Sequence, residues 1–163
     1  MHSTDTEPMD EEQRAEFANR TGANLAISLR VDASDNADAA GVSTYYYGIE
    51  AHGVHSSAGE RFAGLVQREI VARTDLSDLR SHPKTFDVLR RTRMPAVRID
   101  VGYLTNPGDA ARLGDPAFRD VVAEAVVVAV QRVYLDREHD AQTGLLRLAE
   151  LRGLAAVQDQ PSI

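Results

Sequence analysis

The fold is decided by residues 95–101, which read PAVRIDV, a compact run rich in β-branched residues. Two further runs share this character, residues 24–31 (NLAISLRV) and residues 41–48 (GVSTYYYG). Each is bounded by glycine, proline or polar residues and is short enough for a strand. We therefore expect three strands, and the apolar character of residues 24–31 predicts that this strand is buried.

Helical patterns lie before, between and after these strands. Residues 10–23 predict a short helix with Asp10 as N-cap, in a capping box, and Gly22 at its end. Residues 57–73 carry apolar side chains at helical spacing. The clearest helix begins at the Asp-Pro pair and spans residues 116–134.

The remaining segments read as connections, with one exception. Residues 74–84 are polar and contain a proline, which favours a loop, and residues 102–108 have turn chemistry. Residues 86–89 predict a short fourth strand. Helices that alternate with strands indicate an α/β domain, with a mixed sheet flanked by helices.

Composition excludes several classes of function. The net charge of −7 argues against a nucleic-acid partner, because such binding requires a clustered cationic surface. The absence of cysteine excludes disulfides and thiol catalysis. The apolar run at residues 121–130 is too short to span a membrane. Residues 1–16 are acidic and polar, unlike a secretory signal, so we expect a cytoplasmic protein.

Four segments, in order, carry a resemblance to a known family. Residues 14–19 contain an R-x-x-x-A-N pattern, and residues 28–33 read SLRVDA. Residues 41–46 read GVSTYY, and residues 94–106 read MPAVRIDVGYLTN. In order and spacing these segments resemble the zinc-dependent N-acetylmuramoyl-L-alanine amidases, which cleave the bond between sugar and stem peptide in peptidoglycan.

The resemblance implies a layered amidase-like fold of the phosphorylase/hydrolase type, lacking its N-terminal strands. It divides the chain into a flexible leader (1–10), a partial amidase domain (11–135) and a C-terminal tail (136–163) with a short helix near residues 143–154. The nearest likeness is a branch of amidase-like proteins without export signals.

The resemblance also implies where the chemistry of the family would lie. There, two histidines and a glutamate hold Zn²⁺, and a further glutamate activates the bound water. The first two ligands belong to a segment that has no counterpart here, and the third falls on Arg30. A guanidinium has no lone pair for a metal. The catalytic glutamate falls on Asp100. We therefore expect no zinc and no other cofactor.

Other residues have a spacing or chemistry that could form a site. His52 and His55 have a spacing that can serve a metal, although two loop histidines are more often solvated. A triad of His55, Asp100 and Ser56 or Ser57 lacks a nucleophile-elbow pattern. The acidic residues of the segment 32–38 lack the ligand order of a calcium loop.

Three further segments have both a functional and a structural interpretation. Tyrosines 45–47 have faces that can stack a sugar, but their alternation favours a strand with alternating burial. Thr105 and Asn106 match a family turn beside the substrate cleft, and the same residues suit a tight turn. Asp32, at a strand end, is the third candidate for the cleft.

Two functions follow from these observations. The favoured one is a catalytically silent amidase homologue that acts as a binding or regulatory module in cell-wall metabolism. Its partner would be peptidoglycan fragments or a protein of cell-wall synthesis. The alternative is a fragment of an active zinc amidase. We expect Arg30 to pair with Asp100, with Arg98 as the competing partner and a solvated Asp100 as the third outcome. We also expect self-association through an exposed sheet edge.

Overall fold

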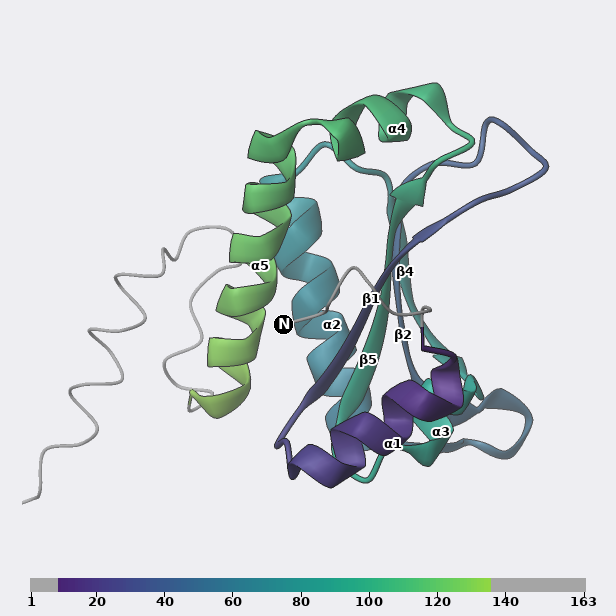
Figure 1. Cartoon of the computed structure of the whole chain (residues 1–163), viewed down its shortest axis with the longest axis vertical. Coiled ribbons are helices and arrows are strands. Elements are labelled where there is room, and N and C mark those ends of the chain that lie inside the picture. The colour runs from purple at the N-terminus through teal and green to yellow at the C-terminus, as the bar shows by residue number, and fades with distance from the viewer. Residues whose placement is uncertain (1–8, 136–163) are drawn as a thin grey trace, which may run out of the picture.

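A computed structural model describes residues 9–135 and shows a sheet with helices on both faces (Figure 1). The helices are α1 (Glu11–Thr21), α2 (Ser57–Arg73), α3 (Asp87–Arg91), α4 (Pro107–Gly114) and α5 (Pro116–Tyr134), with a 3₁₀ turn η1 (Glu50–His52). The strands are β1 (Ala26–Asp32), β2 (Val42–Ile49), β3 (Val54–His55), β4 (Asp78–Lys84) and β5 (Ala96–Tyr103). The predicted α/β fold with a mixed sheet is confirmed.

Strand β5 lies inside the sheet, between β1 and β2. It pairs in parallel with β1 and antiparallel with β2, and β2 also pairs in parallel with β4 and antiparallel with β3. Hence β1 is an edge strand that pairs with β5 alone among the described strands. Strand neighbours flank β5 on both edges, so its alternate residues Val97, Ile99 and Val101 are buried in the main core, while Arg98 and Asp100 lie on the other face.

The two faces of the sheet are covered differently. One face carries Val42, Val97 and Ile99 and packs against α2 and α5 in the main hydrophobic core. The other face packs Ala96 and the half-buried Tyr45 against α3, with α1 alongside (Figure 1). The helices α1 and α3 cover only part of this second face, so the remainder holds polar side chains.

The local signals at the helix ends are confirmed. Asp10 caps α1 in a capping box with Gln13, and Gly22 ends the helix in the left-handed region at φ 62°. Asp115 caps α5, with Pro116 in its first turn. These features depend on residues three or four apart, so the sequence alone specifies them.

Three sequence predictions are wrong. The predicted loop 74–84 contains β4, which tolerates Pro83 because its second edge is unpaired in the described part of the chain. The predicted strand 86–89 is helix α3, whose Val88 and Leu89 are buried in a small core. The strand predicted to be buried at residues 24–31 is the edge strand β1.

The exposure of β1 has a physical cause. Its apolar side chains face the groove beside α5, and Leu29 remains 57% exposed because β1 has a neighbour on one side only. The tail from residue 136, including the short helix predicted near 143–154, lies outside the described residues. Within residues 9–135, none of the helices combines the length and the apolarity that a membrane span requires.

Candidate functional site

The polar face of the sheet collects the residues that the sequence singled out. Strands β1 and β5 run in parallel, with Ser28 opposite Arg98 and Arg30 opposite Asp100. Alternate residues of a strand share a face, so these four side chains emerge on one side of the sheet. The two strands, 70 residues apart in sequence at Arg30 and Asp100, therefore bring the predicted site residues together.

Arg98 holds Asp100 in a bidentate pair. Its Nε and Nη2 each donate to one carboxylate oxygen of Asp100, and both distances are 2.9 Å. The side chains are nearly buried, with 11% of Arg98 and 4% of Asp100 exposed. The guanidinium also lies over the ring of Phe86, 4.2 Å from its centroid, which fixes its plane. Both oxygens of the candidate catalytic carboxylate are thus occupied by one arginine.

Glu11 completes the network from the first turn of α1. One oxygen, Oε1, accepts from Arg98 at 3.0 Å and from Arg30 at 3.1 Å. We call these four residues, Glu11, Arg30, Arg98 and Asp100, the arginine network. It carries two positive and two negative charges, so its formal charges cancel. Glu11 is also well placed electrostatically, because carboxylates are favoured at helix N-termini.

The expected pair between Arg30 and Asp100 is wrong. The competing partner named from the sequence, Arg98, takes the carboxylate, and Arg30 pairs with Glu11 instead. Arg98 and Asp100 are two residues apart on the same face of one strand, so little chain entropy is lost when they meet. Arg30 remains partly exposed, with 39% of its side chain accessible.

The charges around the network shift nearby pKa values. Partial burial works against the charged form of Arg98, but the hydrogen bonds and charges of Asp100 and Glu11 outweigh it and raise the pKa of Arg98. Burial, followed by the charge of Asp32, raises the pKa of Tyr103. Arg98 therefore keeps its positive charge near neutral pH despite its partial burial.

The candidate cleft residues Thr105 and Asn106 hold a loop in place. Thr105 Oγ1 accepts from the amide of Ser34 at 3.0 Å, and the Asn106 side-chain amide donates to the carbonyl of Ala37 at 2.9 Å. Asn106 also caps α4. The structural interpretation accounts for both residues, since their side chains fix the loop at residues 33–40.

Asp32 also forms hydrogen bonds at the start of this loop. Its side chain accepts from the amide of Ala33 at 2.8 Å, and its carbonyl accepts from Leu104. Asp38, another acidic residue of this loop, belongs to a turn, in which its backbone amide donates to the side chain of Asn36. Within residues 9–135, no group of three or more His, Cys, Asp or Glu side chains is placed to hold a metal ion.

Sequence reasoning missed Asp109, the buried carboxylate of this region. It is 1% exposed and accepts from the backbone amides of Gly41 at 2.8 Å and Tyr103 at 3.0 Å. Gly41 lies at φ 119°, where a Cβ would come within 2.4 Å of the Ser77 carbonyl oxygen. The signal in the sequence is an acidic residue in the first turn of a helix that Asn106 caps. From the sequence, only a turn is predicted at residues 102–108.

The histidine sites are not assembled. His55 lies opposite Gly48 on β2, whereas Asp100 lies opposite Ser43, five residues away along the same strand. A separation of five residues along a strand is about 16 Å. His55 pairs with Glu60 at 3.0 Å instead. A triad that joins His55 to Asp100 is therefore excluded by the register.

The tyrosine run shows the alternating burial of a strand. Tyr46 is buried in the main core, and its hydroxyl donates to Glu60 at 3.2 Å. Tyr45 faces the other side, where its ring meets the Phe86 ring edge to face at 5.4 Å. The strand interpretation accounts for both rings.

The residues present do not fit the zinc of the resemblance. The resemblance puts a histidine ligand at Arg30, whose guanidinium offers only donors. The resemblance puts the catalytic glutamate at Asp100, and Arg98 donates to both oxygens of this carboxylate. A Zn²⁺ ion needs lone pairs directed at it, and here the side chains satisfy one another.

Comparison with known proteins agrees with the motifs. Residues 1–132 match the sequence pattern of the family described as N-acetylmuramoyl-L-alanine amidase. Over 148 residues the chain is 45% identical to the N-acetylmuramoyl-L-alanine amidase CwlM of Mycobacterium tuberculosis, covering 91% of this chain and 36% of that protein. The chain thus spans about a third of that relative.

Solved amidase structures have the same arrangement of elements. An N-acetylmuramoyl-L-alanine amidase from Clostridium difficile 630 superposes with a TM-score of 0.70 at 27% identity, over 77% of this chain and 66% of that one. The catalytic domain of CwlV from Bacillus (Paenibacillus) polymyxa gives 0.69 at 29% identity, with the same coverage. The layered fold on which the site is built is shared with both.

Proposed function

Because the chain belongs to the N-acetylmuramoyl-L-alanine amidase family, we propose that it is a catalytically silent member that binds or regulates in cell-wall metabolism. One observation supports this proposal above the others. The Asp100 carboxylate, at the position of the catalytic glutamate, is nearly buried and held on both oxygens by Arg98. Arg98 donates to both oxygens of Asp100, so the carboxylate is already engaged where a general base must accept a proton.

The state of Arg30 supports the same proposal. Its guanidinium bridges to Glu11, so it is fixed by an ion pair at the place where the resemblance puts a metal ligand. The arginine network replaces an ion of charge two with two side-chain cations and their two carboxylates. Such an arrangement links the ends of β1 and β5 to α1 through side chains alone.

The proposed partners are peptidoglycan fragments or a protein of cell-wall synthesis, met in the cytoplasm. The chain also self-associates under this proposal, because Ile27, Leu29 and Val31 of the edge strand are 41%, 57% and 41% exposed. Exposed apolar side chains on an unpaired strand edge favour pairing with another chain.

The alternative function is that of an active amidase fragment whose other ligands come from outside residues 1–163. The acid at residue 100 favours it, because aspartate keeps the carboxylate that the reaction needs. Two measurements on the purified chain separate the functions: the zinc content by elemental analysis, and the release of stem peptide from muropeptides by chromatography. We expect well under one zinc per chain and no release.

An Arg30→His variant sharpens the test. It restores the histidine of the family, but Asp100 remains bound to Arg98, so we expect the variant to gain no tightly held zinc. If the unsubstituted chain instead holds one zinc and releases peptide in a chelator-sensitive manner, the silent function is refuted and the alternative stands.

A further inference from the structure

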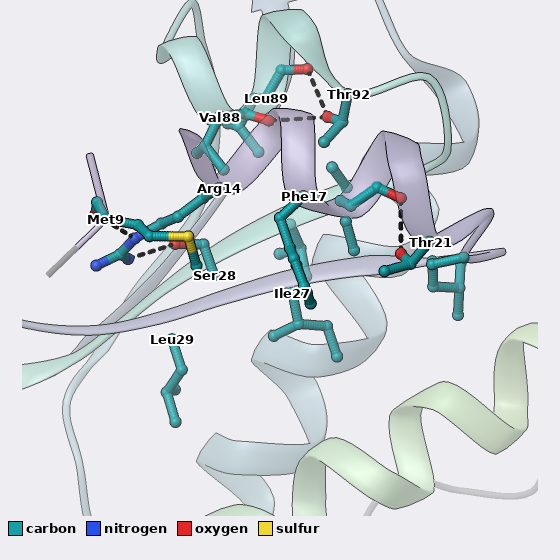
Figure 2. A pocket seen from close by; sticks show the side chains of 16 residues that line it. Met9, Arg14, Phe17, Thr21, Ile27, Ser28, Leu29, Val88, Leu89 and Thr92 are labelled. Atoms are coloured by element: carbon teal, nitrogen blue, oxygen red, sulfur yellow. Dashed lines mark hydrogen bonds between the residues drawn. The ribbon is translucent and has the colours of Figure 1, made fainter. Parts of the chain in front are cut away.

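A second site lies beside the arginine network, in the angle between α1 and the edge strand β1. It is a cavity of about 470 Å³ bounded by α1, β1, α3 and the start of β5. Phe17 and Ile27 line one part of it and Val88 and Leu89 another (Figure 2). Small-molecule pockets of about 300–1,000 Å³ are typically apolar with a few placed polar groups, and this cavity has that character.

Most of the polar side chains of the cavity are already satisfied. The Thr21 hydroxyl donates to the Ala18 carbonyl of its own helix at 2.9 Å. The Thr92 hydroxyl donates to the Val88 and Leu89 carbonyls at 2.8 and 3.2 Å. Both appear as dashed lines in Figure 2. Neither hydroxyl has a proton left to offer a ligand.

Arg14 is different, because it brings a positive charge to one end of the cavity. Its Nε donates to the Met9 carbonyl at 2.9 Å, and its Nη1 lies 3.5 Å from the Ser28 hydroxyl. Figure 2 shows the guanidinium beside Met9 and Ser28, away from Thr21. Among residues 9–135, no carboxylate forms an ion pair with Arg14. A guanidinium has five N–H donors, so several remain available.

The cavity is apolar and has at one end a cation without an ion-pair partner among the described residues, and these two features define the kind of ligand that would fit it. An apolar chain would take the place of water against Phe17 and Ile27, each of which is about half exposed, at 52% and 41%. A single negative charge would accept the remaining hydrogen bonds of Arg14 and cancel its charge. A cation would be repelled, and a neutral ligand would leave Arg14 unmatched.

We propose that the cavity between α1 and β1 binds a monoanionic amphiphile, with its carboxylate on Arg14 and its hydrocarbon chain along Phe17 and Ile27. The site shares no residue with the arginine network, although Ile27 also belongs to the β1 edge proposed for self-association. It adds to the chain a binding activity for a small acyl carboxylate.

The probe for this site is decanoate, and the measurement is isothermal titration calorimetry on the full chain. We expect saturable binding of one decanoate per chain and much weaker binding of 1-decanol, which has the same chain without the charge. Arg14→Gln should weaken decanoate binding by at least about tenfold, the loss expected when a charge-assisted hydrogen bond is removed.

Arg20→Gln is the matched control, because Arg20 lies on the same helix, is exposed and does not line the cavity. It removes the same charge and should leave binding unchanged. Ala18→Phe fills the cavity from α1 without altering charge and should abolish binding. Thermal melts of each variant establish that it is folded, so a loss of binding reports on the cavity.

Three results would overturn the proposal. The first is the absence of decanoate binding by the folded, unsubstituted chain, including the case in which another protein segment fills the cavity. The second is equal affinity for decanoate in the Arg14→Gln and Arg20→Gln variants. The third is binding that survives Ala18→Phe, because it would place the ligand elsewhere on the molecule.

Discussion

The pairing of Arg98 with Asp100 predicts a specific pattern of coupling in unfolding experiments. Asp100→Ala leaves Arg98 89% removed from solvent without its bidentate partner, since its side chain is 11% exposed. Arg98→Ala leaves Asp100 buried and also removes the guanidinium from the Phe86 ring. Arg30 does not contact Asp100, although the two residues are opposite each other in the sheet.

The magnitudes follow from burial. Removal of one partner from a buried ion pair costs about 3–5 kcal/mol of the free energy of unfolding. In Asp100→Ala, Glu11 still neutralises part of the Arg98 charge from 3.0 Å, so we expect a loss of about 3 kcal/mol. Arg98→Ala should cost about 4 kcal/mol, because the ring contact is lost as well. The double variant has no orphan charge at this pair, so the coupling free energy should be about 2 kcal/mol. For Arg30 and Asp100 we expect a coupling below about 0.5 kcal/mol.

Urea unfolding of the four variants in each cycle measures these values, with tyrosine fluorescence and circular dichroism as two probes of the same transition. The slope of the free energy of unfolding with urea should stay constant across variants. The reasoning is refuted if the Arg30 and Asp100 cycle shows the larger coupling, or if the Arg98 and Asp100 substitutions are additive.

Three further predictions concern the rest of the molecule. Arg132→Ala should lower the free energy of unfolding in urea by about 3 kcal/mol, because the fully buried Glu69 loses a cation that lies 3.0 Å from its carboxylate. A loss below about 1 kcal/mol would contradict this prediction. Leu29→Lys should reduce self-association in light scattering, whereas Val54→Lys, at a comparably exposed residue of another strand, should not; equal effects would rule out the β1 edge. Burial and a neighbouring carboxylate raise the pKa of Tyr46 above its ordinary 10.0, so its contribution to stability should be intact below about pH 10 and lost as pH rises further. Tyr46→Phe should flatten this alkaline loss in melts across pH, and an unchanged profile would disprove the assignment.

Features that depend on near neighbours along the chain could be predicted from the sequence. The capping box of Asp10, the start of α5 at Pro116 and the strand character of β5 all follow from residues a few positions apart. The sequence also placed Arg30 and Asp100 at adjacent strand ends, because the ordered motifs carried the resemblance to the amidase family. The helix caps and the strand pattern depend on residues that are close in sequence. The family resemblance depends on the order of motifs along the chain. Neither kind of signal requires knowing which residues are close in space.

Which charges meet, and which segments are covered, depends on how the layers pack. Residues 86–89 became a helix because Val88 and Leu89 are buried in the small core beside the sheet. Arg98, not Arg30, took Asp100 because the Phe86 ring fixes its guanidinium, while Glu11 reached Arg30 from a helix 19 residues earlier. An arginine side chain is long and can reach several carboxylates, so its partner depends on contacts that are remote in sequence and form only when the layers pack.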